Sequence, residues 1–143
     1  MSPSPHATIE RWLDGYVGEH GGVAGSVHVL RDGDLHLEAT VRIPEVVRKA
    51  VAVVPRGKGM AGLAWERGVA VQTCNLQEDS ADVKPGARAV DAHAAVAIPV
   101  GDPTGAFFGV VGIAFMEEGE LPAARVRALS TAAAGLEGVA ASG

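Results

Sequence analysis

Cysteine, aromatic residues and long hydrophobic runs are all scarce in this chain of 143 residues. The single cysteine, Cys74, excludes an internal disulfide and a cysteine-rich zinc site. No apolar run reaches the length of a membrane-spanning helix, and residues 1–6 lack the apolar segment of a secretory signal. We therefore predict a cytoplasmic protein with no membrane partner.

Basic residues are fewer than acidic ones, and the formal net charge is −5. The lysines and arginines are scattered among acids, which excludes the clustered basic surface that a nucleic-acid partner needs. Hydrophobic residues make up 48% of the chain but aromatic residues only 4%, so alanine, valine and glycine must build much of the core. The length suits one domain, with a disordered leader over residues 1–6 and a single domain over residues 7–140.

Apolar periodicity predicts a helix at each end of the domain. Between residues 7 and 20 the apolar side chains recur at helical spacing and form one stripe: Ile9, Trp12, Leu13, Tyr16 and Val17. A second apolar seam follows Leu121-Pro122 in steps of three and four: Val126, Leu129, Ala133, Leu136 and Ala140.

A hairpin is predicted around Asp32-Gly33, which lies between two strand-like segments over residues 23–30 and 34–43. A two-residue turn there pairs Val29 with His36 and His28 with Leu37. His28 and His36 then point to opposite faces of the sheet, so they do not share a metal site. A short helix over 44–50, a strand over 51–54 and a long polar segment over 75–92 are predicted further along the chain.

The most specific pattern is a glycine-rich turn that leads into a short helix, Gly57-Lys58-Gly59-Met60-Ala61-Gly62-Leu63-Ala64. Gly68 ends this helix, and a strand over residues 69–73 follows. Two more strands, Val96-Ala97-Ile98-Pro99-Val100 and Gly109-Val110-Val111-Gly112-Ile113-Ala114-Phe115, form a second hairpin. This order of turn, helix, strand, long loop and hairpin resembles the GAF domain family, over about residues 8–139.

The resemblance implies an α+β fold of the GAF and PAS type, in which a central antiparallel sheet is flanked by the N- and C-terminal helices. It implies a ligand pocket on the other face of the sheet and pairing of two copies through the terminal helices. Members of the family bind cyclic nucleotides, bilins, haem or amino acids, and no pattern in this chain selects a cofactor among them. We predict a small-molecule-binding sensor or regulatory domain that acts as a stand-alone homodimer and signals to a separate protein partner.

One enzymatic branch of the family, the free methionine-R-sulfoxide reductases, has about this length. That branch places a cysteine in the glycine-rich turn, where this chain has Ala61, and its catalytic cysteine near residues 89–91, where this chain has none. Its carboxylates are matched here by Ala95, Gly112 and Ala114. Because the chemistry needs a thiolate and carboxylates at these places, we do not expect methionine sulfoxide reductase activity.

We expect the pocket between the sheet and the segment over residues 75–93. The candidate ligand-binding residues are Met60, Trp65, Thr73, Cys74, Asn75, Asp79, Asp91 and His93. Each also has a structural explanation: Met60 and Trp65 as core, Cys74 as a buried free thiol, and the polar residues as caps of their own loop. With one histidine in this region, we predict no metal site.

Two aromatic residues, Trp12 and Tyr16, exceed what packing requires in so aromatic-poor a chain. Since aromatic residues are enriched in interface cores, we assign Trp12, Tyr16, Val126 and Leu129 to a dimer interface. Two other hypotheses stay open beside the sensor: a small enzyme of unrecognised chemistry that uses Cys74 or His93, and a ligand-free scaffold module.

Overall fold

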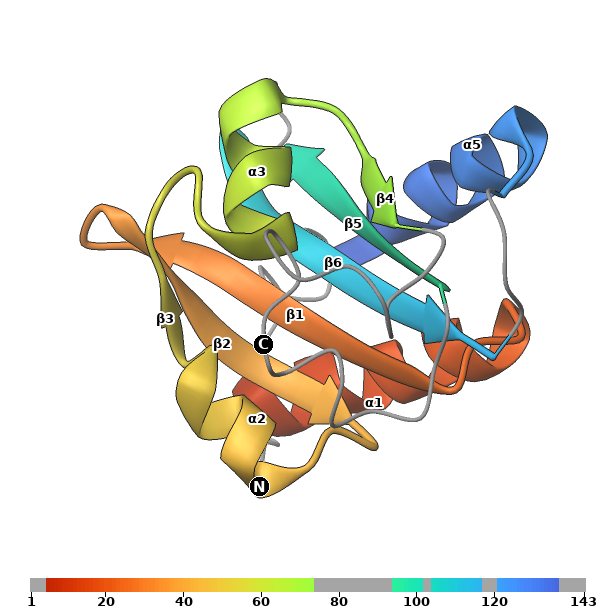
Figure 1. Cartoon of the computed structure of the whole chain (residues 1–143), viewed down its shortest axis with the longest axis horizontal. Helices are drawn as coiled ribbons and strands as arrows, with labels where there is room; N and C mark the ends of the chain where they lie inside the picture. The colour runs from red at the N-terminus through yellow and green to blue at the C-terminus, as the bar shows by residue number, and fades with distance from the viewer. Residues whose placement is uncertain (1–4, 74–93, 102–103, 117–120, 137–143) are drawn as a thin grey trace.

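A six-stranded antiparallel sheet divides the molecule into two layers (Figure 1). The computed structural model describes residues 5–73, 94–101, 104–116 and 121–136. Its elements are α1 (Pro5–Glu19), β1 (Ala24–Arg31), β2 (Asp34–Val41), α2 (Glu45–Ala50), β3 (Val53–Val54), α3 (Gly59–Arg67), β4 (Val71–Thr73), β5 (Ala94–Gly101), β6 (Phe107–Phe115) and α5 (Ala123–Ala133). The strands lie in the order β3-β2-β1-β6-β5-β4, so the two predicted hairpins meet at the centre of the sheet. The predicted α+β fold with helices flanking an antiparallel sheet is confirmed.

The β1–β2 hairpin has the predicted register. Asp32 and Gly33 both have positive φ, 51° and 86°, as a two-residue turn of this hand requires. Val29 pairs with His36 and His28 with Leu37, so the two histidines lie on opposite faces. The ladder shifts register between Val27 and His28.

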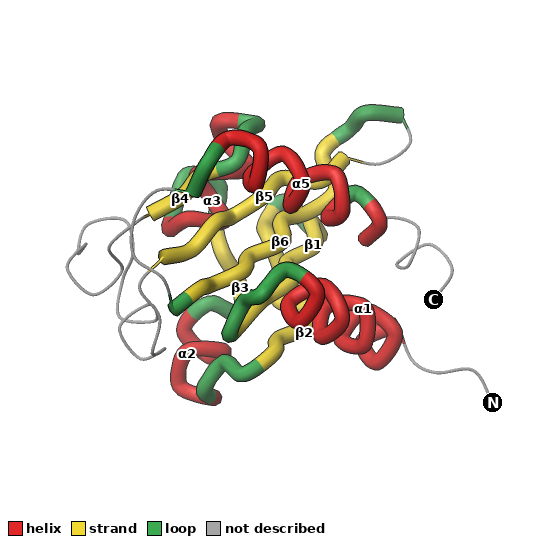
Figure 2. The backbone as a smooth tube through the Cα atoms, turned by 90° about the vertical axis from the view of Figure 1, so that its right-hand side faces the viewer, coloured by secondary structure: helices red, strands yellow, loops and turns green. Residues whose placement is uncertain are grey.

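The terminal helices cover one face of the sheet, which we call the helical face (Figure 2). The predicted stripe of α1 packs there against α5 and the valine and isoleucine side chains of the central strands. The approach is close at Gly25, because a Cβ atom there would lie 2.6 Å from a methyl carbon of Val17. Glycine at this position therefore lets α1 rest almost directly on the backbone of β1.

The opposite face carries α2 and α3, and we call it the open face (Figure 2). α3 packs over β5 and β6 around a small apolar cluster that includes Leu35, Ala97 and Val110. The glycine-rich turn before α3 closes on itself, with the Gly57 amide donating to the Gly62 carbonyl at 2.9 Å. A Cβ at Gly62 would lie 2.5 Å from the Pro55 carbonyl oxygen, so the turn requires glycine there. The close approach of the backbone is therefore the structural reason for glycine at residue 62.

Several predicted boundaries differ from the structure. α1 begins at Pro5, inside the expected leader, because proline suits the first turn of a helix. The strand predicted over 51–54 is only Val53–Val54, and the one predicted over 69–73 begins at Val71. The long polar segment over 75–92 lies outside the described residues.

Candidate functional site

The two faces of the sheet differ in how completely the described elements cover them. On the helical face, Val96, Val27 and Ile113 are at most 1% exposed. Their neighbours in the same strands, which point to the open face, are small and only half-buried. These residues, which we call the small-residue floor, are Ser26, Thr40, Ala95, Gly112 and Ala114.

Strand pairing brings the small-residue floor together from four strands. Ser26 of β1 pairs with Thr40 of β2 on one side and with Gly112 of β6 on the other, while Ala95 of β5 pairs with Ala114 of β6. A Cβ at Gly112 would lie 2.8 Å from the Ser26 hydroxyl oxygen, which confirms that both residues face the same side. Any side chain at residue 112 would therefore fill the centre of the floor.

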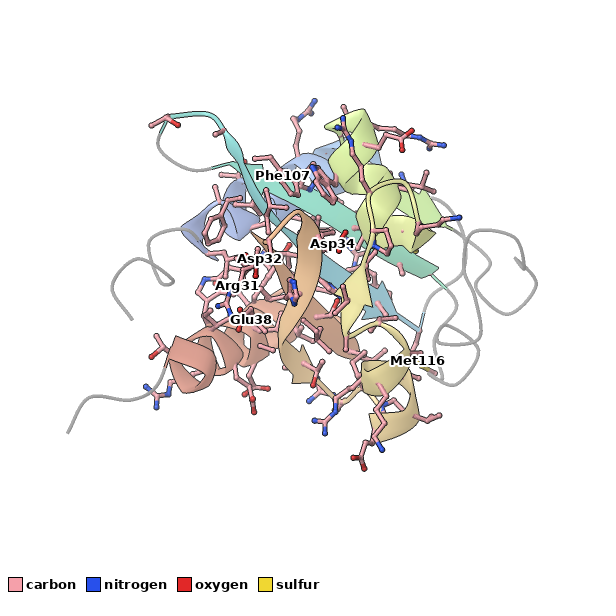
Figure 3. All side chains as sticks on the ribbon, turned by 90° about the vertical axis from the view of Figure 1, so that its left-hand side faces the viewer. Arg31, Asp32, Asp34, Glu38, Phe107 and Met116 are labelled. Atoms are coloured by element: carbon pink, nitrogen blue, oxygen red, sulfur yellow. The ribbon has the colours of Figure 1, made fainter. Side chains whose placement is uncertain are left out.

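α3 forms one wall beside the floor. Its residues Met60, Ala61 and Trp65 pack against the apolar cluster of the open face. The Trp65 ring stacks on Phe107 with centroids 5.4 Å apart and planes 9° apart. The Arg56 guanidinium lies 5.8 Å from the Trp65 ring, and Figure 3 shows Phe107 close beside α3. The part of this wall formed by Met60, Ala61 and Trp65 is therefore apolar and aromatic, with a cation in contact with the Trp65 ring.

His28 is the one buried imidazole of the open face among the described residues. It lies two residues after Ser26 on β1 and is only 4% exposed. Its Nε2 lies 2.9 Å from the Val51 carbonyl oxygen. Burial lowers the pKa of His28, the Val51 hydrogen bond opposes this shift, and the charge on His36 lowers it further.

The predicted ligand-binding residues divide into two groups. Met60 and Trp65 lie together on α3, facing the sheet, and the backbone of Thr73 ends β4. Cys74, Asn75, Asp79, Asp91 and His93 lie outside the described residues, so their assignment stays a prediction. Among the described residues, no three His, Cys, Asp or Glu side chains gather in a metal-binding arrangement.

Two of the four residues assigned to the dimer interface are buried within the protomer, and the assignment of an interface stays a prediction. Tyr16 is 4% exposed and Leu129 is fully buried. The Tyr16 hydroxyl donates to the Leu129 carbonyl oxygen at 2.9 Å, and the ring contacts Trp12 and His20. The aromatic residue thus joins α1 to α5 within one chain. Trp12 and Val126 are half-buried.

The positions that match the reductase carboxylates, Ala95, Gly112 and Ala114, all belong to the small-residue floor. Ala61, which matches a reductase cysteine, packs against the apolar cluster beneath α3. The floor therefore offers no charge where the resemblance to the reductases would place carboxylates. Its polar groups are the hydroxyls of Ser26 and Thr40.

Comparison with known families agrees with this architecture. The family model of the GAF domain matches residues 3–137, nearly the whole chain. The chain belongs to the GAF domain family. No curated protein matches the sequence.

Solved structures share the fold of this GAF domain at low sequence identity. The GAF domain of a phosphoenolpyruvate-protein phosphotransferase from Coxiella burnetii superposes with a TM-score of 0.80 at 19% identity, over 99% of this chain and 84% of that chain. The corresponding domain from Acinetobacter superposes with a TM-score of 0.77 at 18% identity, over 99% of this chain and 84% of that chain. A type II free methionine-R-sulfoxide reductase from Thermoplasma acidophilum gives 0.72 at 17% identity, over 96% and 92%. At these identities the likeness concerns the fold.

Sequence reasoning missed the small-residue floor. Its signal is present in the sequence, because Gly112 and Ala114 alternate with the large apolar residues Val111, Ile113 and Phe115. Small residues at alternate positions fit equally well beneath a tightly packed helix, however, so the alternation alone does not indicate a face that the described elements leave partly exposed.

Proposed function

We propose that this GAF domain binds a small molecule on the open face of its sheet, over the small-residue floor and beside α3. The observation that carries the proposal is the contrast between the faces. Ser26, Ala95 and Ala114 stay half-buried, whereas the neighbouring side chains on the helical face are sealed. A ligand that covers such a floor gains free energy mainly by removing apolar surface from water.

The chemistry of the floor and wall favours a ligand with a flat, largely apolar side. Alanine and glycine on β5 and β6 let a ring lie close to the sheet, and Met60 and Trp65 supply apolar contacts at its edge. Ser26 and Thr40 supply hydroxyls that both donate and accept hydrogen bonds. The floor carries no charge, so a ligand with a charged group would direct that group away from it.

We further propose that the domain acts as a homodimer through the outer surfaces of α1 and α5 and passes its signal to a separate protein partner. The support is that Trp12 and Val126 are only half-buried, although their side chains also contact the core of the helical face. Sedimentation analysis of wild type and of Trp12→Glu tests this part. A dimer that becomes a monomer in the variant agrees with it, and a wild-type monomer at high concentration contradicts it.

Native mass spectrometry tests the ligand site. Gly112→Leu would place a branched side chain in the centre of the floor, where the Ser26 hydroxyl oxygen lies 2.8 Å from the position of Cβ. The matched control is Gly15→Ala, since Gly15 is exposed on α1 with open space around it. We expect freshly purified wild type and control to carry an added mass that denaturation removes, and Gly112→Leu to lose it. Equal added mass on a folded Gly112→Leu contradicts the assignment.

A further inference from the structure

His28 is a buried imidazole with only one of its two nitrogens satisfied. Its Nε2 meets the Val51 carbonyl oxygen, whereas Nδ1 is buried and has no hydrogen-bond partner in the described part of the chain. Because a carbonyl oxygen only accepts, Nε2 must carry the hydrogen of the neutral ring. Nδ1 is then the bare nitrogen, and it is the site where a proton would be added.

The hydrogen bond between His28 and the Val51 carbonyl joins two elements of the fold. Val51 follows α2 directly and its amide donates to Val47, so the His28 bond holds the end of α2 against the central strand β1. The next carbonyl, that of Ala52, accepts from the Leu37 amide at 2.9 Å. These two contacts fasten the α2–β3 segment, residues 45–54, to the sheet.

Among the described residues, no acidic side chain is recorded in contact with His28. β6, which pairs with β1, carries no ionisable residue, and neither does β3. The ionisable residues of the other nearby elements are Arg31 on β1, Asp34, His36 and Glu38 on β2, Glu45, Arg48 and Lys49 on α2, and Glu66 and Arg67 on α3. Of the acids, Asp34 lies at the hairpin end of β2, where it pairs with Arg31 in the strand register, and Glu38 is ion-paired to Arg31 (Figure 3). Glu45 and Glu66 are exposed. His36 lies on the opposite face and its charge opposes protonation of His28.

We propose that His28 is a proton-operated latch, which holds the α2–β3 segment on the sheet while its ring is neutral and releases the segment when the ring is protonated. An imidazolium at this place would bury an N–H group without an acceptor, which is costly in an apolar environment. Because His28 is only 4% exposed, the ring must move to bring Nδ1 into water, and we expect that movement to break the Nε2 bond to Val51. α2 borders the same open face (Figure 1), so release of the segment would change one border of the proposed ligand site. This effect on ligand binding rests on the function proposed above.

The direction of the pH effect follows from burial. Burial lowers the pKa of His28 in the folded state, so the open state binds the proton more readily than the closed state. The closed state is therefore fully stable above the ordinary histidine pKa of about 6.5 and loses stability as the pH falls below it. If the ring stays neutral in the closed state, the equilibrium constant for opening of the α2–β3 segment rises about tenfold from pH 7.5 to pH 5.5.

Amide hydrogen exchange read by NMR tests the latch without any ligand. The protection of the Leu37 and Val51 amides, corrected for the intrinsic pH dependence of exchange, is measured at both pH values in the full chain. We expect it to fall about tenfold on acidification in wild type, while the Val111 amide at the centre of the sheet changes less. His28→Gln keeps an N–H donor for the Val51 carbonyl but does not titrate. In this variant the protection of the two amides should therefore not fall on acidification. His36→Gln is the matched control and should keep the loss of protection on acidification. The size of that loss should differ somewhat from wild type, because the His36 charge no longer opposes protonation of His28.

Two results overturn the proposal. One is equal protection of the Leu37 and Val51 amides at both pH values in wild type. The other is an undiminished loss of protection in a folded His28→Gln. Should that variant fail to fold, the wild-type imidazole carbon shifts decide instead: a His28 that titrates with no change in the two amides is not a latch. Failure of the ligand proposal would leave all these measurements unaffected.

Discussion

Replacing Tyr16 by phenylalanine isolates one hydrogen bond between the terminal helices. The hydroxyl donates to the Leu129 carbonyl oxygen at 2.9 Å across a buried contact, and the ring packs against Trp12 and His20. Tyr16→Phe removes the bond and keeps the ring. A buried hydrogen bond contributes roughly 0.5–1.5 kcal/mol, and the carbonyl left with one donor fewer adds to the cost. We expect the free energy of unfolding to fall by about 1–2 kcal/mol.

Urea unfolding followed by circular dichroism measures this loss, and thermal unfolding should show a lower Tm by about 3–6 °C. Burial raises the pKa of Tyr16, so its neutral form is favoured in the folded state. Its contribution is therefore complete below the ordinary tyrosine pKa of about 10 and is lost as the pH rises above it. The phenylalanine variant should lack that alkaline loss.

The oligomeric state distinguishes a core role of Tyr16 from an interface role. Because the side chain is covered by its own protomer, Tyr16→Phe should leave the sedimentation behaviour unchanged at every protein concentration. A loss of stability below 0.5 kcal/mol would refute the hydrogen-bond argument, since that is the lower end for such a bond. A shift toward monomer with unchanged protomer stability would instead place Tyr16 at the interface.

Three further stability predictions use urea unfolding. Arg31→Ala should lower the free energy of unfolding by about 2–3 kcal/mol, and Glu38→Gln by about 1 kcal/mol. The Glu38 side chain is 2% exposed and the Arg31 side chain 54%, so loss of the arginine leaves a buried charge whereas loss of the carboxylate leaves an exposed one. Equal losses would contradict this asymmetry. Gly109→Ala should cost at least about 2–3 kcal/mol, because its Cβ would lie 2.3 Å from the His28 carbonyl oxygen. Gly15→Ala, with open space around Gly15, should gain up to about 1 kcal/mol.

The parts of the fold that local chemistry determines were predictable from the sequence. Asp32-Gly33 allows the positive φ values of a tight hairpin turn, and that turn then determines the register that separates His28 from His36. The stripe of α1 and the C-terminal seam show which side of each helix is apolar, and both sides pack on the helical face as expected. Gly68 ends α3 with φ of 70°, as a helix-ending glycine does.

Features that depend on tertiary contacts were not predictable in the same way. Tyr16 was assigned to an interface from composition, yet its hydroxyl finds a partner in the backbone of α5, and no local pattern indicates that contact. The small-residue floor depends on which elements reach over Ser26 and Ala114, and residue spacing carries no such information. The remaining predicted ligand residues from Cys74 to His93 lie outside the described residues and stay predictions.

Methyl NMR of alanine-labelled protein tests the ligand site most directly. Ala95 and Ala114 belong to the small-residue floor, whereas Ala39 and Ala133 are buried in the core of the helical face. On titration with pooled aromatic and heteroaromatic metabolites, we predict that a binding compound shifts the Ala95 and Ala114 methyl signals and leaves those of Ala39 and Ala133 in place. Binding that shifts only the Ala39 and Ala133 signals, or that leaves the Ala95 and Ala114 signals unmoved, would contradict a ligand site on the open face.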